Sequence, residues 1–137
     1  IIRWPKRFAG GHTVHENVNL CDIYATLCDL CGVPCPSGLD SRSLVPLMDG
    51  NAVDWNNETV SQFGSSNVMI KRDNLKYQYY GPNMPEVLFD LDADSKECLD
   101  FIKDPDYAES VEIFRQRLSA LGHGPNADPM YVNAGYC

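Results

Sequence analysis

A run of four short strand-like segments between residues 59 and 91 is the feature that most constrains the fold of this chain. The segments are residues 59–63, 68–72, 76–80 and 87–91. Asp73-Asn74 favours a tight turn between two of them, and residues 81–85 favour a looser one. Because no helical pattern interrupts the run, and parallel neighbours need a long crossover, the sequence predicts an antiparallel meander.

Apolar residues recur at helical spacing before this predicted sheet. They are Leu20, Ile23, Tyr24, Leu27, Leu30 and Cys31. Steps of three and four place them on one face, which predicts an amphipathic helix over residues 19–31. Asn17 or Asn19 is expected to cap its start, and Gly32 to supply the left-handed residue after its end.

A second helical pattern follows the predicted sheet. Its apolar members are Tyr107, Val111, Phe114, Leu118 and Leu121, at steps of four, three, four and three. They predict a helix over residues 105–121. Asp104 is expected as its N-cap, Pro105 at its first position and Gly122 at its close.

Charge and hydropathy exclude two classes of partner. The chain has 137 residues, with 11 Lys and Arg against 19 Asp and Glu, and a formal net charge of -8. The acidic balance argues against binding to phosphate backbones or anionic membranes, which need clustered Lys and Arg. No apolar run approaches the roughly 20 residues of a membrane span. We therefore expect neither nucleic acid nor a membrane as a partner.

The chain opens as if a strand were already under way. Residues 1–5 read Ile-Ile-Arg-Trp-Pro, without the charged and apolar regions of a signal peptide. We expect the chain to be a segment of a longer protein. A short natural domain with a processed N-terminus is the alternative.

Six cysteines leave three interpretations open. They are Cys21, Cys28, Cys31, Cys35, Cys98 and Cys137. A disulfide framework is disfavoured because Cys28 and Cys31 would lie on adjacent turns of one helix. A zinc site would need further ligands, and only His12 and His15 stand near in sequence. We expect free thiols, as in a cytoplasmic protein, while a glycosylation sequon at Asn57 leaves secretion or the periplasm open.

Five phrases of the sequence, in this order, resemble the sulfatase family of the alkaline phosphatase superfamily. Residues 1–5 resemble its LIIRWPG strand, and residues 19–27 (NLCDIYATL) its VDLxPTLLDLAG helix. Residues 32–48 resemble GxPxPxxLDGxSLxPLL, residues 74–77 an xxKY strand, and residues 88–97 LFDLxxDPxExxN. Four positions depart from these patterns: Ala25 and Ser95 replace Pro, Ser41 replaces Gly, and Asp100 replaces Asn. All four are structural positions in the family.

The resemblance implies an α/β fold of alkaline phosphatase type for the parent enzyme. Residues 1–50 would be the end of its large α/β domain, supplying an edge strand and a covering helix. Residues 51–137 would form a C-terminal subdomain, with an antiparallel sheet, the helix at 105–121 and an irregular tail docked through Tyr131 and Tyr136.

The resemblance also implies the chemistry of a sulfuric ester hydrolase. The family makes a formylglycine nucleophile within Cys/Ser-x-Pro-x-Arg and uses a calcium ion to polarise the sulfate oxygens. That string is absent from this sequence. We therefore expect the catalytic and calcium-binding residues to lie upstream, with no catalytic residue and no metal ligand in this chain. Its substrate-binding residues stay unidentified.

The expected partners are the upstream part of the same sulfatase and a sulfated small molecule or sugar. A phosphonate or phosphate monoester hydrolase of the same superfamily is the nearest alternative. A non-catalytic sugar-binding module is another, and a redox or metal module built on the cysteines a third.

Several local patterns have structural interpretations that we favour over functional ones. Cys35-Pro36-Ser37 lacks the spacing of the nucleophile signature and is typical of a turn. Asp90-x-Asp92-x-Asp94 lacks the Gly and Glu of a calcium loop, so we expect a solvated exit from the last strand.

Histidines and strand aromatics also have two interpretations each. His12, His15 and His123 lie in loops without a readable carboxylate or nucleophile partner. The aromatic residues Tyr77, Tyr79, Tyr80 and Phe89 could stack on a sugar, but strand aromatics more commonly pack a sheet against a helix.

Overall fold

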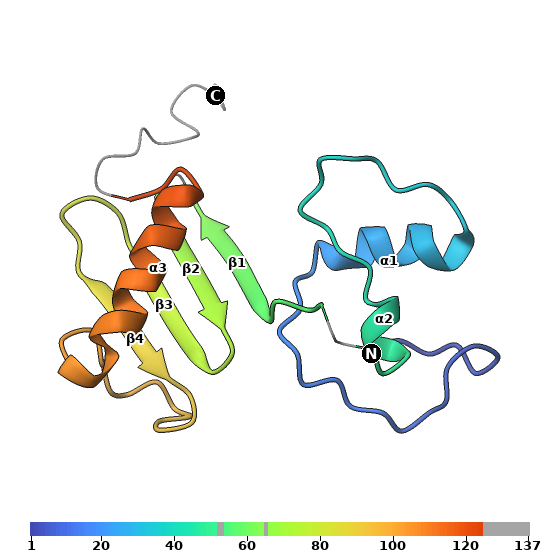
Figure 1. The fold of residues 1–137 in the computed structure, drawn as a ribbon, viewed down its shortest axis with the longest axis horizontal. Helices are drawn as coiled ribbons and strands as arrows, with labels where there is room; N and C mark the ends of the chain where they lie inside the picture. The colour runs from blue at the N-terminus through green and yellow to red at the C-terminus, as the bar shows by residue number, and fades with distance from the viewer. Residues whose placement is uncertain (52–53, 65, 125–137) are drawn as a thin grey trace. The chain divides into compact units, whose positions relative to one another are not determined.

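The computed structural model describes residues 1–51, 54–64 and 66–124 and divides the chain into two compact units (Figure 1). The first unit is Ile1–Asn57 and the second is Glu58–Cys137. This division falls close to the boundary expected after residue 50. That the two units are the end of a large sulfatase domain and a C-terminal subdomain stays a prediction.

The second unit contains the predicted antiparallel meander. Its strands are β1 (Glu58–Phe63), β2 (Asn67–Arg72), β3 (Leu75–Tyr79) and β4 (Glu86–Asp90), paired in chain order. The strand prediction is thus confirmed to within one residue at each end. Asp73, in the turn between β2 and β3, takes a left-handed φ of 50°, a conformation that Asp and Asn tolerate well.

One face of this sheet is covered by the predicted last helix (Figure 1). A 3₁₀ turn, η1 (Pro105–Tyr107), leads into α3 (Ala108–Ala120). Asp104 caps the start, its carboxylate accepting a hydrogen bond from the Asp106 N–H, as predicted. The buried core comprises Val68, Ile70, Tyr77, Tyr79, Leu88, Val111, Phe114 and Leu118.

The first unit contains the predicted helix as α1 (Asp22–Cys31), followed by a single turn, α2 (Val45–Met48). Gly32 ends α1 with a left-handed φ of 65°, as predicted. The predicted cap by Asn17 or Asn19 is wrong: Cys21 occupies the N-cap and makes no side-chain capping bond. Instead the Asp22 carboxylate, inside the first turn, accepts a hydrogen bond from the Asn19 N–H at 2.8 Å.

The strand expected at residues 1–5 is not formed. The segment is irregular and enters a turn in which the Trp4 carbonyl accepts bonds from the Arg7 and Phe8 N–H groups. A strand needs a neighbour to pair its backbone groups, and the described residues of the first unit contain no other strand. The tail contacts expected of Tyr131 and Tyr136 lie outside the described residues. No described helix is long and apolar enough to cross a bilayer.

Candidate functional site

Helix α1 buries its polar side and exposes its apolar side. Asp22 and Thr26 are 1% and 2% exposed, whereas Ile23, Tyr24 and Leu27 are 44–56% exposed and Leu20 is 80% exposed. We call these last four residues the α1 stripe. A helix normally turns such a stripe toward a core. Within the first unit the stripe has no such cover, which marks it as a contact surface.

The buried side of α1 holds the following loop through side-chain to backbone hydrogen bonds. The Asp22 carboxylate accepts a bond from the Arg42 N–H at 2.9 Å. Thr26 Oγ1 accepts one from the Leu44 N–H at 2.9 Å and donates to the Asp22 carbonyl at 2.6 Å. Because backbone donors satisfy it, the buried Asp22 carboxylate needs no cationic partner. These residues lie in the segments that resemble the sulfatase patterns, and their hydrogen bonds join two of those segments.

Ser41 inserts its hydroxyl into the start of α1. Its Oγ accepts a hydrogen bond from the Ala25 N–H at 2.9 Å and donates to the Cys21 carbonyl at 2.6 Å. Ala25 and Ser41 are two of the positions that depart from the sulfatase patterns, where Pro and Gly stand. Proline has no N–H and glycine has no hydroxyl, so the bond between Ala25 and Ser41 depends on both departures.

A second polar cluster of the first unit surrounds Trp55. The Arg42 guanidinium lies 3.9 Å from the centre of the Trp55 ring, and the indole N–H donates to the Asn17 carbonyl at 3.0 Å. The Asn17 N–H donates to the side-chain oxygen of Asn57 at 2.6 Å. The sequon asparagine is therefore hydrogen-bonded to the segment that precedes α1.

His12 lies in a groove of about 280 Å³ in the first unit. Its lining residues are His12, Thr13, Val14, Glu16, Leu47, Met48, Asp49 and Gly50. Arg7 binds Asp49 through two bonds of 2.7 and 2.6 Å, and the hydrogen bond from Arg7 lowers the pKa of that carboxyl. Among the described residues that line the groove, Thr13 carries the hydroxyl, and neither a Ser nor a Cys lies beside His12.

The other two candidate histidines take part in local hydrogen bonds through their backbone N–H groups. The His15 N–H donates to the carboxylate of its neighbour Glu16 at 3.1 Å. The His123 N–H donates to the Leu118 carbonyl at 3.0 Å, which helps to close α3.

The acidic pattern after β4 organises its own loop. Asp90 accepts hydrogen bonds from the Asp92 and Ala93 N–H groups, at 2.9 and 3.2 Å, and from the Tyr107 hydroxyl at 2.7 Å. Asp94 accepts bonds from the Lys96 and Leu99 N–H groups, at 3.1 and 2.7 Å. These two carboxylates are therefore loop caps, and the expectation of a merely solvated strand exit understated their role.

Hydrogen bonding explains the acidity of both groups. The Tyr107 hydroxyl lowers the pKa of Asp90, and the Leu99 N–H lowers that of Asp94. The same Asp90 bond raises the pKa of Tyr107 to about 12. Asp100, where the family has Asn, likewise accepts bonds from the Leu88 and Ile102 N–H groups, both at 3.0 Å. An amide oxygen would serve equally well there, so this departure keeps the bonding pattern.

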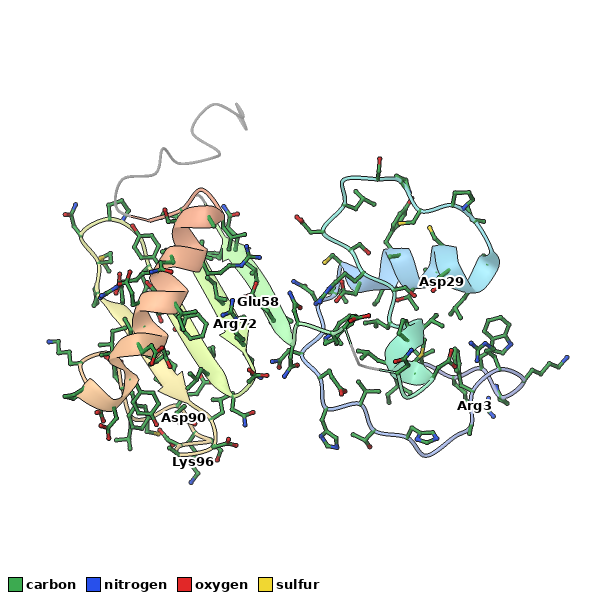
Figure 2. All side chains as sticks on the ribbon, viewed as in Figure 1. Arg3, Asp29, Glu58, Arg72, Asp90 and Lys96 are labelled. Atoms are coloured by element: carbon green, nitrogen blue, oxygen red, sulfur yellow. The ribbon has the colours of Figure 1, made fainter. Side chains whose placement is uncertain are left out.

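Glu58 is a buried carboxylate that the sequence patterns did not single out. It is 6% exposed, and its carboxylate lies 2.5 Å from Arg72 Nη2 (Figure 2). The other carboxylate oxygen accepts a hydrogen bond from Arg117 Nε at 2.8 Å. Burial acts to raise the pKa of Glu58, but the hydrogen bonds from Arg72 and Arg117 outweigh it, and the pKa is lowered. The cross-strand pairing of Glu58 with Arg72 was the available sequence signal.

The aromatic residues of the sheet divide between core and surface. Tyr77 and Tyr79 are buried beneath α3, and the Tyr77 ring stacks on Phe114 with 5.5 Å between ring centres. This confirms the core interpretation for these two residues. Tyr80 is 40% exposed and borders a shallow groove of about 270 Å³. The groove is lined by Ser61, Gln62, Phe63, Asn67, Val68, Met69, Gln78, Tyr79 and Tyr80.

The described residues form no metal centre. Across residues 1–51, 54–64 and 66–124, no three His, Cys, Asp or Glu side chains are placed to hold an ion together. Five cysteines in the described part of the chain are free of disulfides, namely Cys21, Cys28, Cys31, Cys35 and Cys98. The described residues thus provide a hydrogen-bonded scaffold with an uncovered apolar stripe on α1.

Comparisons with known proteins identify that scaffold. The family described as "N-sulphoglucosamine sulphohydrolase, C-terminal" matches residues 1–123. Arylsulfatase K of Gallus gallus is 34% identical over an alignment of 113 positions, which covers 69% of this chain and 21% of that protein. The chain thus spans about a fifth of the length of this curated relative.

Two solved structures share the fold. The first, solved in complex with its substrate D-glucosamine-2-N,6-O-disulfate, has a TM-score of 0.77 at 22% identity, covering 88% of this chain and 27% of that one. The second is the phosphonate monoester hydrolase of Agrobacterium radiobacter, with a TM-score of 0.60 at 25% identity, covering 73% of this chain and 24% of that one.

Proposed function

Because the chain belongs to the C-terminal family of N-sulphoglucosamine sulphohydrolase and is a C-terminal sulfatase segment of the alkaline phosphatase superfamily, we propose that it works as part of an enzyme that hydrolyses sulfate esters of sugars. The observation that carries this proposal is the family match over residues 1–123. The structure adds a reason for that match, since the hydrogen bonds of Asp22 and Thr26 join two of the resembling segments. A sugar substrate is supported by the substrate complex of the structural neighbour.

In this proposal the first unit completes the large domain of the parent enzyme. The α1 stripe supports it, because four apolar side chains on one helix face lack cover within their own unit. Residues 1–5 support it too, because they form no strand within the first unit and a neighbouring strand could pair their backbone groups. The upstream part of the same protein is thus the expected partner.

The formylglycine and the calcium ion belong to that upstream part. Three carboxylates of the described residues do not fit a calcium site: Asp90 and Asp94 accept bonds from backbone N–H groups, and Glu58 is bound to two arginines. Calcium would polarise the sulfate oxygens where it is bound. This chain contributes the first unit, in which hydrogen bonds join α1 to the following loop, and the second unit, in which a helix packs on a sheet.

The test compares the chain alone with the chain joined to its upstream part. Each is assayed with an aryl sulfate, a sulfated glucosamine and a phenyl phosphonate monoester. We expect calcium-dependent release of sulfate from the joined protein and none from the isolated chain. Turnover of the phosphonate ester alone would favour the second activity, which the likeness to the Agrobacterium hydrolase supports. Sulfate release by the isolated chain would contradict the proposal.

A further inference from the structure

The sheet of the second unit has a second face, turned away from α3. Side chains along a strand point alternately to opposite faces, and Val68 and Tyr79 are buried beneath α3. Their neighbours Met69 and Gln78 therefore lie on the other face, where they pair with each other across the strands and Met69 also pairs with Ser61. The groove of about 270 Å³ that Tyr80 borders lies among these residues, beside the turn between β1 and β2.

Two aromatic side chains of this groove are open to solvent. Phe63 is 81% exposed and Tyr80 is 40% exposed. The Tyr80 hydroxyl donates a hydrogen bond to the side-chain oxygen of Gln78, which restrains the ring. A tyrosine side chain has only two rotatable angles, so its ring gives a large contact area at a small cost in entropy. Tyr80 is therefore a preformed stacking surface.

The polar part of the lining carries no charge. Its side-chain amides and hydroxyl come from Ser61, Gln62, Asn67 and Gln78, and an amide can both donate and accept hydrogen bonds. Among the described residues that line the groove none is acidic or basic, although the chain has a formal net charge of -8. A charged ligand would find no opposite charge there to offset its desolvation. The lining thus favours a neutral ligand with an apolar face and hydrogen-bonding edges.

A pyranose sugar has this character, with C–H groups on the faces of its ring and hydroxyls around its edge. We propose that the groove binds one ring of an uncharged oligosaccharide, stacked on Tyr80 and hydrogen-bonded by the side chains of Gln78 and Asn67. The volume of the groove is just below the range of about 300–1,000 Å³ for small-molecule pockets, so it fits one ring rather than a whole oligosaccharide. A shallow groove of this size gives weak binding, in the millimolar range. Because no bond is made or broken here, the site is independent of the proposed sulfate hydrolysis.

The experiment titrates the full chain with three neutral trisaccharides, namely chitotriose, cellotriose and maltotriose, and separately with sodium sulfate. NMR signals of the Asn and Gln side-chain amides and of the tyrosine rings report binding. We expect saturable shifts with at least one trisaccharide, unchanged by added salt because no charge is involved. Tyr80→Ala should weaken this binding about tenfold, because the stacking surface is lost. Ile113→Ala is the matched control: Ile113 is 42% exposed on α3, on the opposite side of the sheet, and its loss should leave the Kd unchanged.

A second titration uses the chain joined to its upstream part, and the same Kd is expected. Loss of binding in the joined protein would show that the upstream part covers the groove, which overturns the proposal. The proposal is also overturned by the absence of saturable shifts with all three trisaccharides, by a Kd that Tyr80→Ala leaves unchanged, or by shifts with sulfate alone.

Discussion

The two units of this protein are stabilised in opposite ways. The second unit has an apolar core of strand and helix residues, with Ile70, Tyr77 and Leu88 fully buried. The first unit buries Asp22 and Thr26 and leaves the α1 stripe exposed. A sheet with one packed helix can bury its own apolar face, whereas a lone helix and loop cannot. The second unit thus contains an apolar core of its own, whereas the proposal that the first unit completes a core with an upstream part rests on its uncovered stripe.

The largest expected effect tests the core of the second unit. Phe114 is 2% exposed and stacks on Tyr77. Phe114→Ala should lower the free energy of unfolding by about 3–5 kcal/mol, because it leaves a cavity. Denaturant unfolding followed by tyrosine fluorescence measures it. Glu112→Ala, on the exposed side of α3, loses only a bond from Gln116 and should cost less than about 0.5 kcal/mol. Equal costs would mean that α3 packs through another face.

The second prediction tests whether the α1 stripe is a buried surface in the parent protein. Leu27→Ala should change the stability of the isolated chain by less than about 0.5 kcal/mol, because Leu27 is 56% exposed. With the upstream part present, the same change should cost about 2–4 kcal/mol. Thermal unfolding of both forms gives the comparison. A small effect in both would remove the main support for docking through this stripe.

The third prediction tests the buried ion pairs of Glu58. Glu58→Gln should cost about 2–3 kcal/mol, because Arg72 and Arg117 lose their shared carboxylate. Glu86→Gln is the matched control: its partner Arg115 has a side chain that is 50% exposed, so the loss should stay below about 1 kcal/mol. Urea unfolding at neutral pH would distinguish the two.

Stability measured against pH tests the same ion pairs of Glu58. The pKa of Glu58 is lower in the folded protein than its ordinary value of 4.5. Its stabilising contribution is therefore complete above pH 4.5 and is lost as the pH falls through the lowered folded pKa. The wild-type protein should lose more stability than Glu58→Gln over this acidic range. Parallel pH curves for the two proteins would contradict this.

The smallest expected effect concerns the coupling of Ala25 and Ser41. Ala25→Pro removes an N–H and places a ring against Ser41 Oγ, and Ser41→Gly removes the bridging hydroxyl. Each change should cost about 1–2 kcal/mol. The double variant should cost about 1 kcal/mol less than the sum of the two. Hydrogen exchange of the α1 amides, in the protein with its upstream part, reports the effect; strict additivity would show that the two departures are independent.

Local sequence patterns predicted most of the secondary structure of the second unit. The strands between residues 59 and 91, the cap at Asp104 and the stripe of α3 follow from periodicity and turn chemistry, because their partners are near in sequence. Cross-strand pairing also brings Glu58 opposite Arg72, but the third member, Arg117, comes from the helix. The Glu58 cluster was missed for that reason.

The first unit was predicted less completely. Periodicity found α1 and its glycine end but placed the cap on asparagine, because the asparagine side chains were considered and the bond from the Asn19 N–H back to the Asp22 carboxylate was not. The strand expected at residues 1–5 depended on a sheet neighbour that the first unit, as far as it is described, does not contain. A sequence pattern shows that a segment is suited to form a strand, but the strand forms only where a second strand pairs with it.

The sequence by itself determined the family, the meander and the two helices, because family motifs and hydrophobic periodicity are local properties of the chain. Only the tertiary structure decided that α1 turns Asp22 and Thr26 toward the following loop and leaves its apolar stripe exposed. It also decided that Ala25 and Ser41 share one hydroxyl bridge, and that Asp90 and Asp94 cap a loop. The bridge joins residues that are sixteen positions apart, and the caps depend on where the loop's N–H groups point. Hydrogen-bond geometry of this kind is fixed only when the chain has folded back on itself.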